Sequence, residues 1–195
     1  NREDARGLKI AEDRGIKTYF INHRDYPVRK DFETAILKLT EKHKIDVIVL
    51  AGFMKVLSSY FVRTFNKPIL NIHPSLLPSF PGLNSQNRAL EYGVKFAGCT
   101  VHFVTEDVDA GPIIAQEIIP IFNDDSEESI AIRILEREHI LLPDNAVEND
   151  GFVNIERAGT VALSGLDSYH RSQSMGRLSY AKPDKPTHWL HDNAT

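Results

Sequence analysis

Two short runs of hydrophobic residues have the pattern of strands buried on both faces of a parallel sheet. The first, Asp46–Gly52, is apolar from Val47 to Ala51 and ends at a glycine. The second, Ile69–His73, ends at Pro74, which disfavours helical backbone at His73 and cannot donate to a sheet ladder. We predict a central strand at each position.

Three further segments are rich in β-branched and aromatic residues, which favours strands. They are Lys17–Asn22, Gly98–Thr105 and Ile113–Ile121, and the last two are separated by an acidic loop. The weaker segments Phe152–Glu156 and Gly159–Leu163 predict a hairpin.

Between these segments the hydrophobic positions recur every three or four residues, the period of an amphipathic helix. The pattern predicts five helices. They lie at Glu3–Asp13, after a cap at Asp31, at Ser59–Phe65, at residues 84–92 with Asn84 or Ser85 as cap, and after a cap at Asp125. Gly15 ends the helix 3–13 and Gly93 ends the helix 84–92, while Glu127 and Glu128 fit the first turn of the helix after Asp125.

The alternation of strands and helices predicts an α/β protein with a Rossmann-like, mostly parallel, doubly wound sheet flanked by helices in a single domain. Such sheets bind ligands beyond the carboxyl ends of their strands. We expect a catalytic domain at residues 1–143 and a C-terminal extension at 144–195, with the hairpin followed by a loosely ordered, polar tail.

Composition narrows the function classes. The 195-residue chain has a formal charge of −4, and its 23 Lys and Arg residues are scattered, which argues against nucleic acid as a partner. The longest apolar run, Val47–Phe53, is far shorter than the roughly 20 residues that span a bilayer, and no signal peptide is evident. We expect a cytoplasmic protein without a membrane partner. Cys99 is the single cysteine, which excludes an internal disulfide or thiolate cluster.

Asn71 and His73 give the strongest local signal for chemistry. They lie two residues apart at the end of a predicted strand, so both side chains point to one face, where a ligand is expected. A histidine supplies a general acid or base near neutral pH, and an asparagine amide stabilises an oxyanion without adding charge. A structural histidine beside a turn asparagine is the alternative.

Asp107 and Asp109 follow the strand 98–105 and would reach the same edge if that strand were parallel to the Asn71 strand. A carboxylate near His73 would favour the imidazolium form. The alternative is an acidic surface turn. A metal site of His73, His102, Asp107 and Asp109 is disfavoured because His102 is in mid-strand without a paired ligand. The sequence contains no metalloprotease, nucleotide phosphate-loop or serine-hydrolase motif.

Four segments in a fixed order resemble the glycinamide ribonucleotide formyltransferase family. They are VIVLAGFMKVLS at 47–58, NIHPSLLPSFPG at 71–82, GCTVHFVTEDVDAGPIIAQ at 98–116 and EREHILLP at 136–143. The resemblance covers roughly residues 1–143. It implies formyl transfer from the co-substrate 10-formyltetrahydrofolate to the amine of glycinamide ribonucleotide in purine biosynthesis, without a metal, by a monomer or homodimer that acts on small molecules.

The resemblance also implies site residues. The catalytic trio falls on Asn71, His73 and Asp109, and Glu138 falls on the ribonucleotide side. The implied folate pocket comprises Arg29, Met54, Lys55, Val56, Leu57, Asn71, Thr105, Glu106, Asp107, Val108 and Asp109. Protonated His73 and Asn71 would stabilise the tetrahedral oxyanion while Asp109 keeps His73 charged.

Two functions stay open as alternatives. Formyltetrahydrofolate deformylase is similar but typically has a second histidine where this chain has Pro74, together with an N-terminal regulatory domain. A non-catalytic folate-binding remnant is the other, because the family's chains begin with a strand and a Gly-rich phosphate-binding turn that are absent before Asn1. We expect those residues upstream. Methionyl-tRNA formyltransferase is also similar, but it adds a tRNA-binding domain for which this chain has neither the length nor the basic charge.

Overall fold

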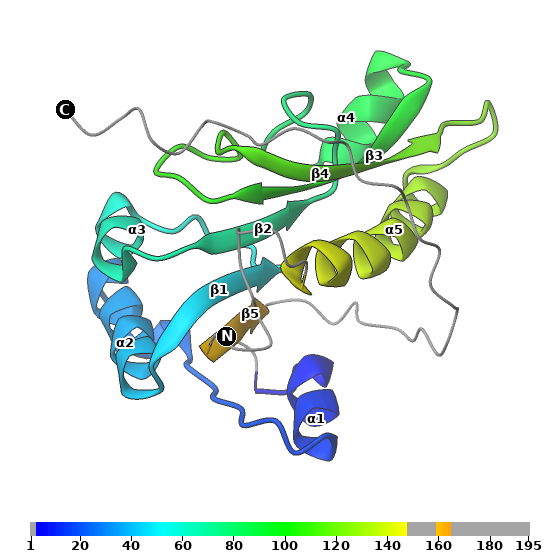
Figure 1. Cartoon of the computed structure of the whole chain (residues 1–195). Coiled ribbons are helices and arrows are strands. Elements are labelled where there is room, and N and C mark those ends of the chain that lie inside the picture. Colours follow the sequence, from blue (N-terminus) through cyan, green and yellow to red (C-terminus); the bar gives the residue numbers. More distant parts are fainter. Residues whose placement is uncertain (1–2, 148–158, 165–195) are drawn as a thin grey trace.

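A computed structural model describes residues 3–147 and 159–164, and its centre is a five-stranded sheet in the order β4-β3-β2-β1-β5 (Figure 1). The strands are β1 (Ile45–Ala51), β2 (Ile69–His73), β3 (Phe96–Phe103), β4 (Ile113–Pro120) and β5 (Gly159–Ser164). The helices are α1 (Arg6–Asp13), the short 3-10 helix η1 (His23–Asp25), α2 (Arg29–Lys42), α3 (Ser59–Phe65), α4 (Ser85–Tyr92) and α5 (Glu127–Val147).

The sheet is mixed. β1 pairs in parallel with β2 and with β5, whereas β3 runs antiparallel to both β2 and β4. The register places Leu50 of β1 beside Asn71, and Asn71 in turn opposite His102. The predicted Rossmann-like α/β class is confirmed, and its parallel part consists of β1, β2 and β5.

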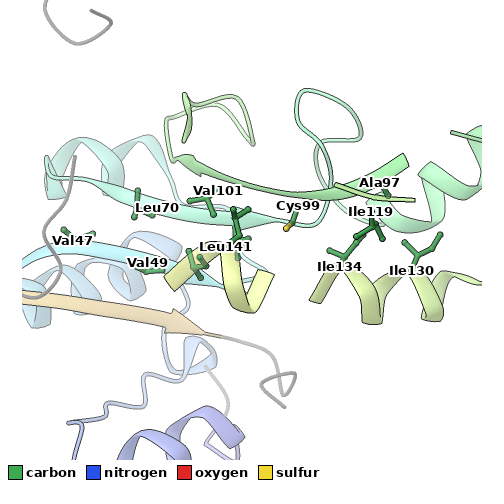
Figure 2. Packing of buried hydrophobic residues seen from close by; sticks show 12 residues of the cluster. Val47, Val49, Leu70, Ala97, Cys99, Val101, Ile119, Ile130, Ile134 and Leu141 are labelled. Carbon is green, nitrogen blue, oxygen red and sulfur yellow. The ribbon is translucent and has the colours of Figure 1, made fainter. Parts of the chain in front are cut away.

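The central strands are buried on both faces, as their uninterrupted apolar sequence predicts. Val47 and Val49 of β1 pack on the α5 side with Ile130 and Ile134, in the layer that Figure 2 shows. Alternate residues of β1 pack on the other side, where Ile48 joins the buried side chains of α2 and α3. Helices therefore cover both faces of the sheet.

Several predicted elements differ from the structure. The segment Lys17–Asn22 forms no strand: Tyr19 and Phe20 are each 40% exposed, and both neighbours of β1 are other strands. Residues 159–163 of the predicted hairpin lie in β5, which pairs with β1, and residues 152–156 fall outside the described residues. Sequence periodicity detects extended segments but does not specify the strand with which each one pairs.

Two predicted helix caps are also wrong. α2 begins at Arg29 after Val28, so Asp31 lies in its first turn. α5 begins at Glu127, and its cap is Ser126 instead of Asp125. The Ser126 side chain accepts the Ser129 N–H at 3.2 Å, whereas Asp125 accepts hydrogen bonds from the Phe122 N–H and from Arg133. Acidic residues near a helix start fit the dipole without being the capping residue. None of the helices in the described part is long and apolar enough to cross a membrane.

Candidate active site

A cavity of about 480 Å³ opens where β1 and β2 end. Its walls are formed by the ends of these strands, the segment after β1, the start of α4, the loop after β3 and the inner side of α5. Gly52, with φ of 64°, turns the chain out of β1 in a conformation that disfavours other residues. The position at the carboxyl ends of parallel strands is the one predicted for a ligand.

Asn71 and His73 both line this cavity, as their spacing predicts. Asn71 lies opposite His102, and its Nδ2 is 3.1 Å from His102 Nε2. The other ring nitrogen, His102 Nδ1, is 2.9 Å from the carbonyl oxygen of Phe103. Because that oxygen only accepts, Nδ1 carries the proton, and Nε2 accepts from the Asn71 amide. Burial lowers the pKa of His102 and favours this neutral form.

His73 is surrounded by acceptors at both ring nitrogens. Its Nδ1 lies 3.4 Å from Asp109 Oδ2, and its Nε2 lies 3.1 Å from the carbonyl oxygen of Phe80. Both ring nitrogens of His73 thus face oxygen atoms, whereas one ring nitrogen of His102 faces the Asn71 amide. The two histidines therefore have different surroundings in the same site.

Asp109 is held in place by the segment after β2. Its Oδ2 accepts the Gly82 N–H at 2.8 Å and lies 3.4 Å from His73 Nδ1. The side chain is only 11% exposed, and the backbone is left-handed with φ of 52°, which aspartate tolerates better than most residues. These contacts fix the carboxylate beside His73 before any ligand binds.

The loop that carries Asp109 reaches the site by a route that the sequence does not predict. β3 is antiparallel to β2, so it ends beside the start of β2, where the Val104 N–H donates to Ile69. The expectation that rested on a parallel strand is wrong. The loop reaches the site because it folds back across the sheet, with Phe103 donating to Pro112 and Gly111 closely packed on Phe103.

The same loop is anchored to α3. The Arg63 guanidinium donates to both carboxylate oxygens of Glu106 at 2.7 Å, in bidentate geometry. This pairing lowers the pKa of Glu106. Within the loop, the Thr105 hydroxyl donates to the Asp107 carbonyl at 3.3 Å. The loop conformation is therefore stabilised by contacts outside the cavity as well as inside it.

All the residues that the family resemblance implies for the site line the cavity, except Arg29. The residues brought together are Met54, Lys55, Val56, Leu57, Asn71, His73, Thr105, Glu106, Asp107, Val108, Asp109 and Glu138. Arg29 lies behind the segment that follows β1, where it donates to the Val56 carbonyl and to Glu33, 3.1 Å away. Arg29 therefore contacts Val56 of the cavity wall but does not line the cavity itself.

Glu138 of α5 contributes an acidic group to the wall of the cavity. Burial raises the pKa of its carboxyl to about 7. A carboxyl group with this pKa is partly protonated near neutral pH, so it can donate as well as accept a hydrogen bond. This property suits a contact with a hydroxyl-bearing ligand.

Sequence reasoning considered His102 only as a metal ligand and overlooked its contact with Asn71. The alternation within β3 places Thr100 and His102 on one face, but only the antiparallel register reveals that His102 is opposite Asn71. The backbone groups of Phe80 and Gly82 carry no sequence signal at all. Among the residues that the structure describes, no group of three or more His, Cys, Asp or Glu side chains is placed to hold a metal ion.

Comparisons with known proteins show the family of this chain. The profile of the formyl transferase family matches residues 1–146. The chain belongs to the formyl transferase family. A crystal structure of glycinamide ribonucleotide transformylase 1 from Symbiobacterium toebii superposes with a TM-score of 0.71 at 41% identity, covering 78% of this chain and 75% of that one.

Curated proteins of purine biosynthesis and formyl transfer are similar to this chain in sequence. The phosphoribosylglycinamide formyltransferase of Escherichia coli is 41% identical over 143 residues, which are 73% of this chain and 68% of that protein. The trifunctional purine biosynthetic protein adenosine-3 of Bos taurus is 49% identical over 143 residues. The chain spans only 14% of the length of this bovine relative.

Proposed function

We propose that this formyl transferase moves a formyl group from 10-formyltetrahydrofolate to the amine of glycinamide ribonucleotide in purine biosynthesis. The observation that carries the proposal is the arrangement of Asn71, His73 and Asp109 at one cavity. Relatives named phosphoribosylglycinamide formyltransferase support the formyl transfer and its acceptor. We also infer that the protein is cytoplasmic and that its partners are these small molecules.

The transfer begins when the amine nitrogen attacks the formyl carbon, which forms a C–N bond and turns the carbonyl oxygen into an oxyanion. Asn71 Nδ2 has two N–H groups, and only one is directed at His102. The second N–H and the His73 imidazolium are the donors for the oxyanion. Asp109 keeps the imidazolium favourable in this step.

The intermediate collapses when the bond between the formyl carbon and folate N10 breaks. The attacking amine loses a proton and N10 gains one, so the net reaction releases tetrahydrofolate and the formylated amide. His73 or a water molecule carries that proton. His73 Nε2 lies 3.1 Å from the Phe80 carbonyl, so the oxyanion would share this donor with a backbone oxygen that keeps the ring oriented.

The folate would lie against the segment after β1 and the loop after β3. Met54 and Val108 are 59% and 50% exposed at the cavity, which provides apolar surface for a planar pterin. Backbone groups of these segments would supply its hydrogen bonds. Arg29, whose side chain is 54% exposed, would face the benzoylglutamate end as the cationic partner of a carboxylate.

The ribonucleotide would lie on the α5 side of the cavity. Glu138 projects from α5 into this wall, and its carboxyl would bond to ribose hydroxyls. The amine end of the substrate would then point toward Asn71 and His73. This arrangement separates the two ligands while their reacting atoms meet at the end of β2.

The test measures loss of the formyl group from 10-formyltetrahydrofolate with and without glycinamide ribonucleotide, for the unaltered protein and for His73→Ala. Turnover that requires the acceptor and is lost in the variant supports the proposal. Turnover without an acceptor overturns it in favour of a deformylase. Folate binding without turnover in either mixture overturns it in favour of a non-catalytic folate-binding protein.

A further inference from the structure

A three-residue segment after β2 contacts both members of the His73–Asp109 pair. The Phe80 carbonyl lies 3.1 Å from His73 Nε2, and the Gly82 N–H donates to Asp109 Oδ2 at 2.8 Å. The segment 80–82 therefore supplies one backbone acceptor and one backbone donor to the proposed catalytic pair. A displacement of this segment would alter the surroundings of both side chains at once.

The backbone of this segment has a conformation that its sequence does not favour. Phe80 has φ of 54°, in the left-handed region that bulky residues rarely adopt. Such a residue persists only where its surroundings hold it in place. Phe80 is contacted from one neighbouring element in particular.

That element is α4. Arg88 Nη1 donates to the Pro81 carbonyl at 2.5 Å, and its guanidinium lies 5.7 Å from the centroid of the Phe80 ring. The ring of Tyr92, one turn further along α4, packs edge-on against Phe80 with centroids 6.0 Å apart. Two side chains of one helix thus hold the ring of Phe80 and the carbonyl that follows it.

Neither Arg88 nor Tyr92 lines the cavity, and Tyr92 is 80% exposed. Their contacts with the segment 80–82 therefore belong neither to the wall of the cavity nor to the hydrophobic core. We propose that Arg88 and Tyr92 are positioning residues: through Phe80 and Pro81 they hold the backbone groups that orient His73 and Asp109. This inference rests on the proposed formyl transfer and adds to it two residues outside the cavity.

The test compares Arg88→Ala and Tyr92→Leu with the unaltered protein. Small displacements of reacting groups cost up to about 100-fold in rate, so we expect kcat to fall about 10-fold for Arg88→Ala and less for Tyr92→Leu. KM for both substrates should change less than about twofold, because neither residue contacts the cavity. Tyr92→Phe keeps the ring and should retain full activity, and Arg88→Lys should recover part of it.

Asn87→Ala is the matched control. Asn87 lies on the same helix, and its amide donates to Glu91 at 2.8 Å, away from the segment 80–82. We expect wild-type kcat from this variant. If it lost as much activity as Arg88→Ala, the effect would belong to α4 as a whole and the positioning role would be overturned.

A second readout separates positioning from stability. The ¹⁵N chemical shift of His73 Nε2 reports its hydrogen bond to Phe80, and we expect it to change in Arg88→Ala at constant pH while the thermal unfolding midpoint stays within a few degrees. An unchanged His73 signal overturns the proposal, whether or not kcat falls. If the unaltered protein transfers no formyl group, the proposed function fails, but the nitrogen signal still decides whether Arg88 positions His73.

Discussion

His73 Nδ1 lies 3.4 Å from Asp109 Oδ2, although Asp109 belongs to a loop that leaves the far end of a neighbouring antiparallel strand. The contact forms because the loop folds back over the sheet and the Gly82 N–H fixes the carboxylate. The pair therefore places a largely buried carboxylate beside one ring nitrogen of His73.

The first prediction concerns this carboxylate. Asp109→Asn removes its negative charge and keeps the size of the side chain, so His73 loses the anion beside its Nδ1. We expect kcat to fall by about 10- to 100-fold while folate binding persists. Steady-state kinetics and a folate titration test this, and a kcat within about twofold of the unaltered protein would contradict the role of the pair.

The second prediction is the effect of removing the imidazole. His73→Ala deletes an oxyanion donor and a proton carrier, which together contribute 100-fold or more in typical enzymes. We expect kcat to fall by at least about 100-fold while folate binding persists, as followed by a fluorescence titration. Turnover within about tenfold of the unaltered protein would refute the assignment.

The central strands and the pair Asn71 and His73 could be predicted because their signals are local. An apolar run marks a strand buried on both faces, and a two-residue spacing places two side chains on one face. Position at the end of the strand then predicts the cavity. Each of these inferences uses residues that are close together in the sequence.

The contacts of His102, Phe80 and Gly82 could not be predicted because they depend on the register between strands and on backbone groups. The antiparallel pairing of β3 decides that His102 is opposite Asn71. The left-handed backbone at Phe80 decides where its carbonyl points. Neither feature can be recognised from the types of residue at these positions. The same reason explains why the expected parallel route to Asp109 was wrong.

The third prediction concerns the anchor of the folate-binding loop. Arg63→Ala removes the bidentate pairing with Glu106 at the base of the loop. Since the loop would contact folate and not the amine substrate, we expect KM for 10-formyltetrahydrofolate to rise about 3- to 10-fold with KM for the ribonucleotide unchanged. Steady-state kinetics with each substrate varied in turn measures both values.

A charge exchange serves as the control for this pair. Glu106→Arg and Arg63→Glu should each raise KM for 10-formyltetrahydrofolate. The double variant with both changes should have a lower KM than either single variant if the two side chains act through each other. Additive effects in the double variant would show that the ion pair does not anchor the loop.

The fourth prediction uses the close packing of Gly111. A Cβ at this position would lie 1.8 Å from the Phe103 carbonyl oxygen, so Gly111→Ala must displace the backbone of the loop. We expect destabilisation by about 2 kcal/mol or more in urea unfolding, together with loss of activity. The matched control is Gly7→Ala, where a Cβ meets no atom within 4 Å. Equal stability of the two variants would contradict this account.

The last prediction concerns Glu138, whose burial raises the pKa of the carboxyl to about 7 in the folded protein from an ordinary value of 4.5. Below pH 4.5 the group is protonated in both the folded and the unfolded state. Between pH 4.5 and 7 the unfolded state releases this proton first, so the contribution of Glu138 to stability falls as pH rises and levels off above pH 7.

Glu138→Gln removes this titration while keeping a polar side chain of similar size. We expect the variant to gain stability relative to the unaltered protein as pH rises from 4.5 to 7, by at most about 3 kcal/mol. The same variant should bind the ribonucleotide more weakly, because an amide replaces the carboxyl that bonds to ribose. Urea unfolding at pH 5 and pH 8 measures the first effect, and a stability difference that is the same at both values would show that the raised pKa is not coupled to folding.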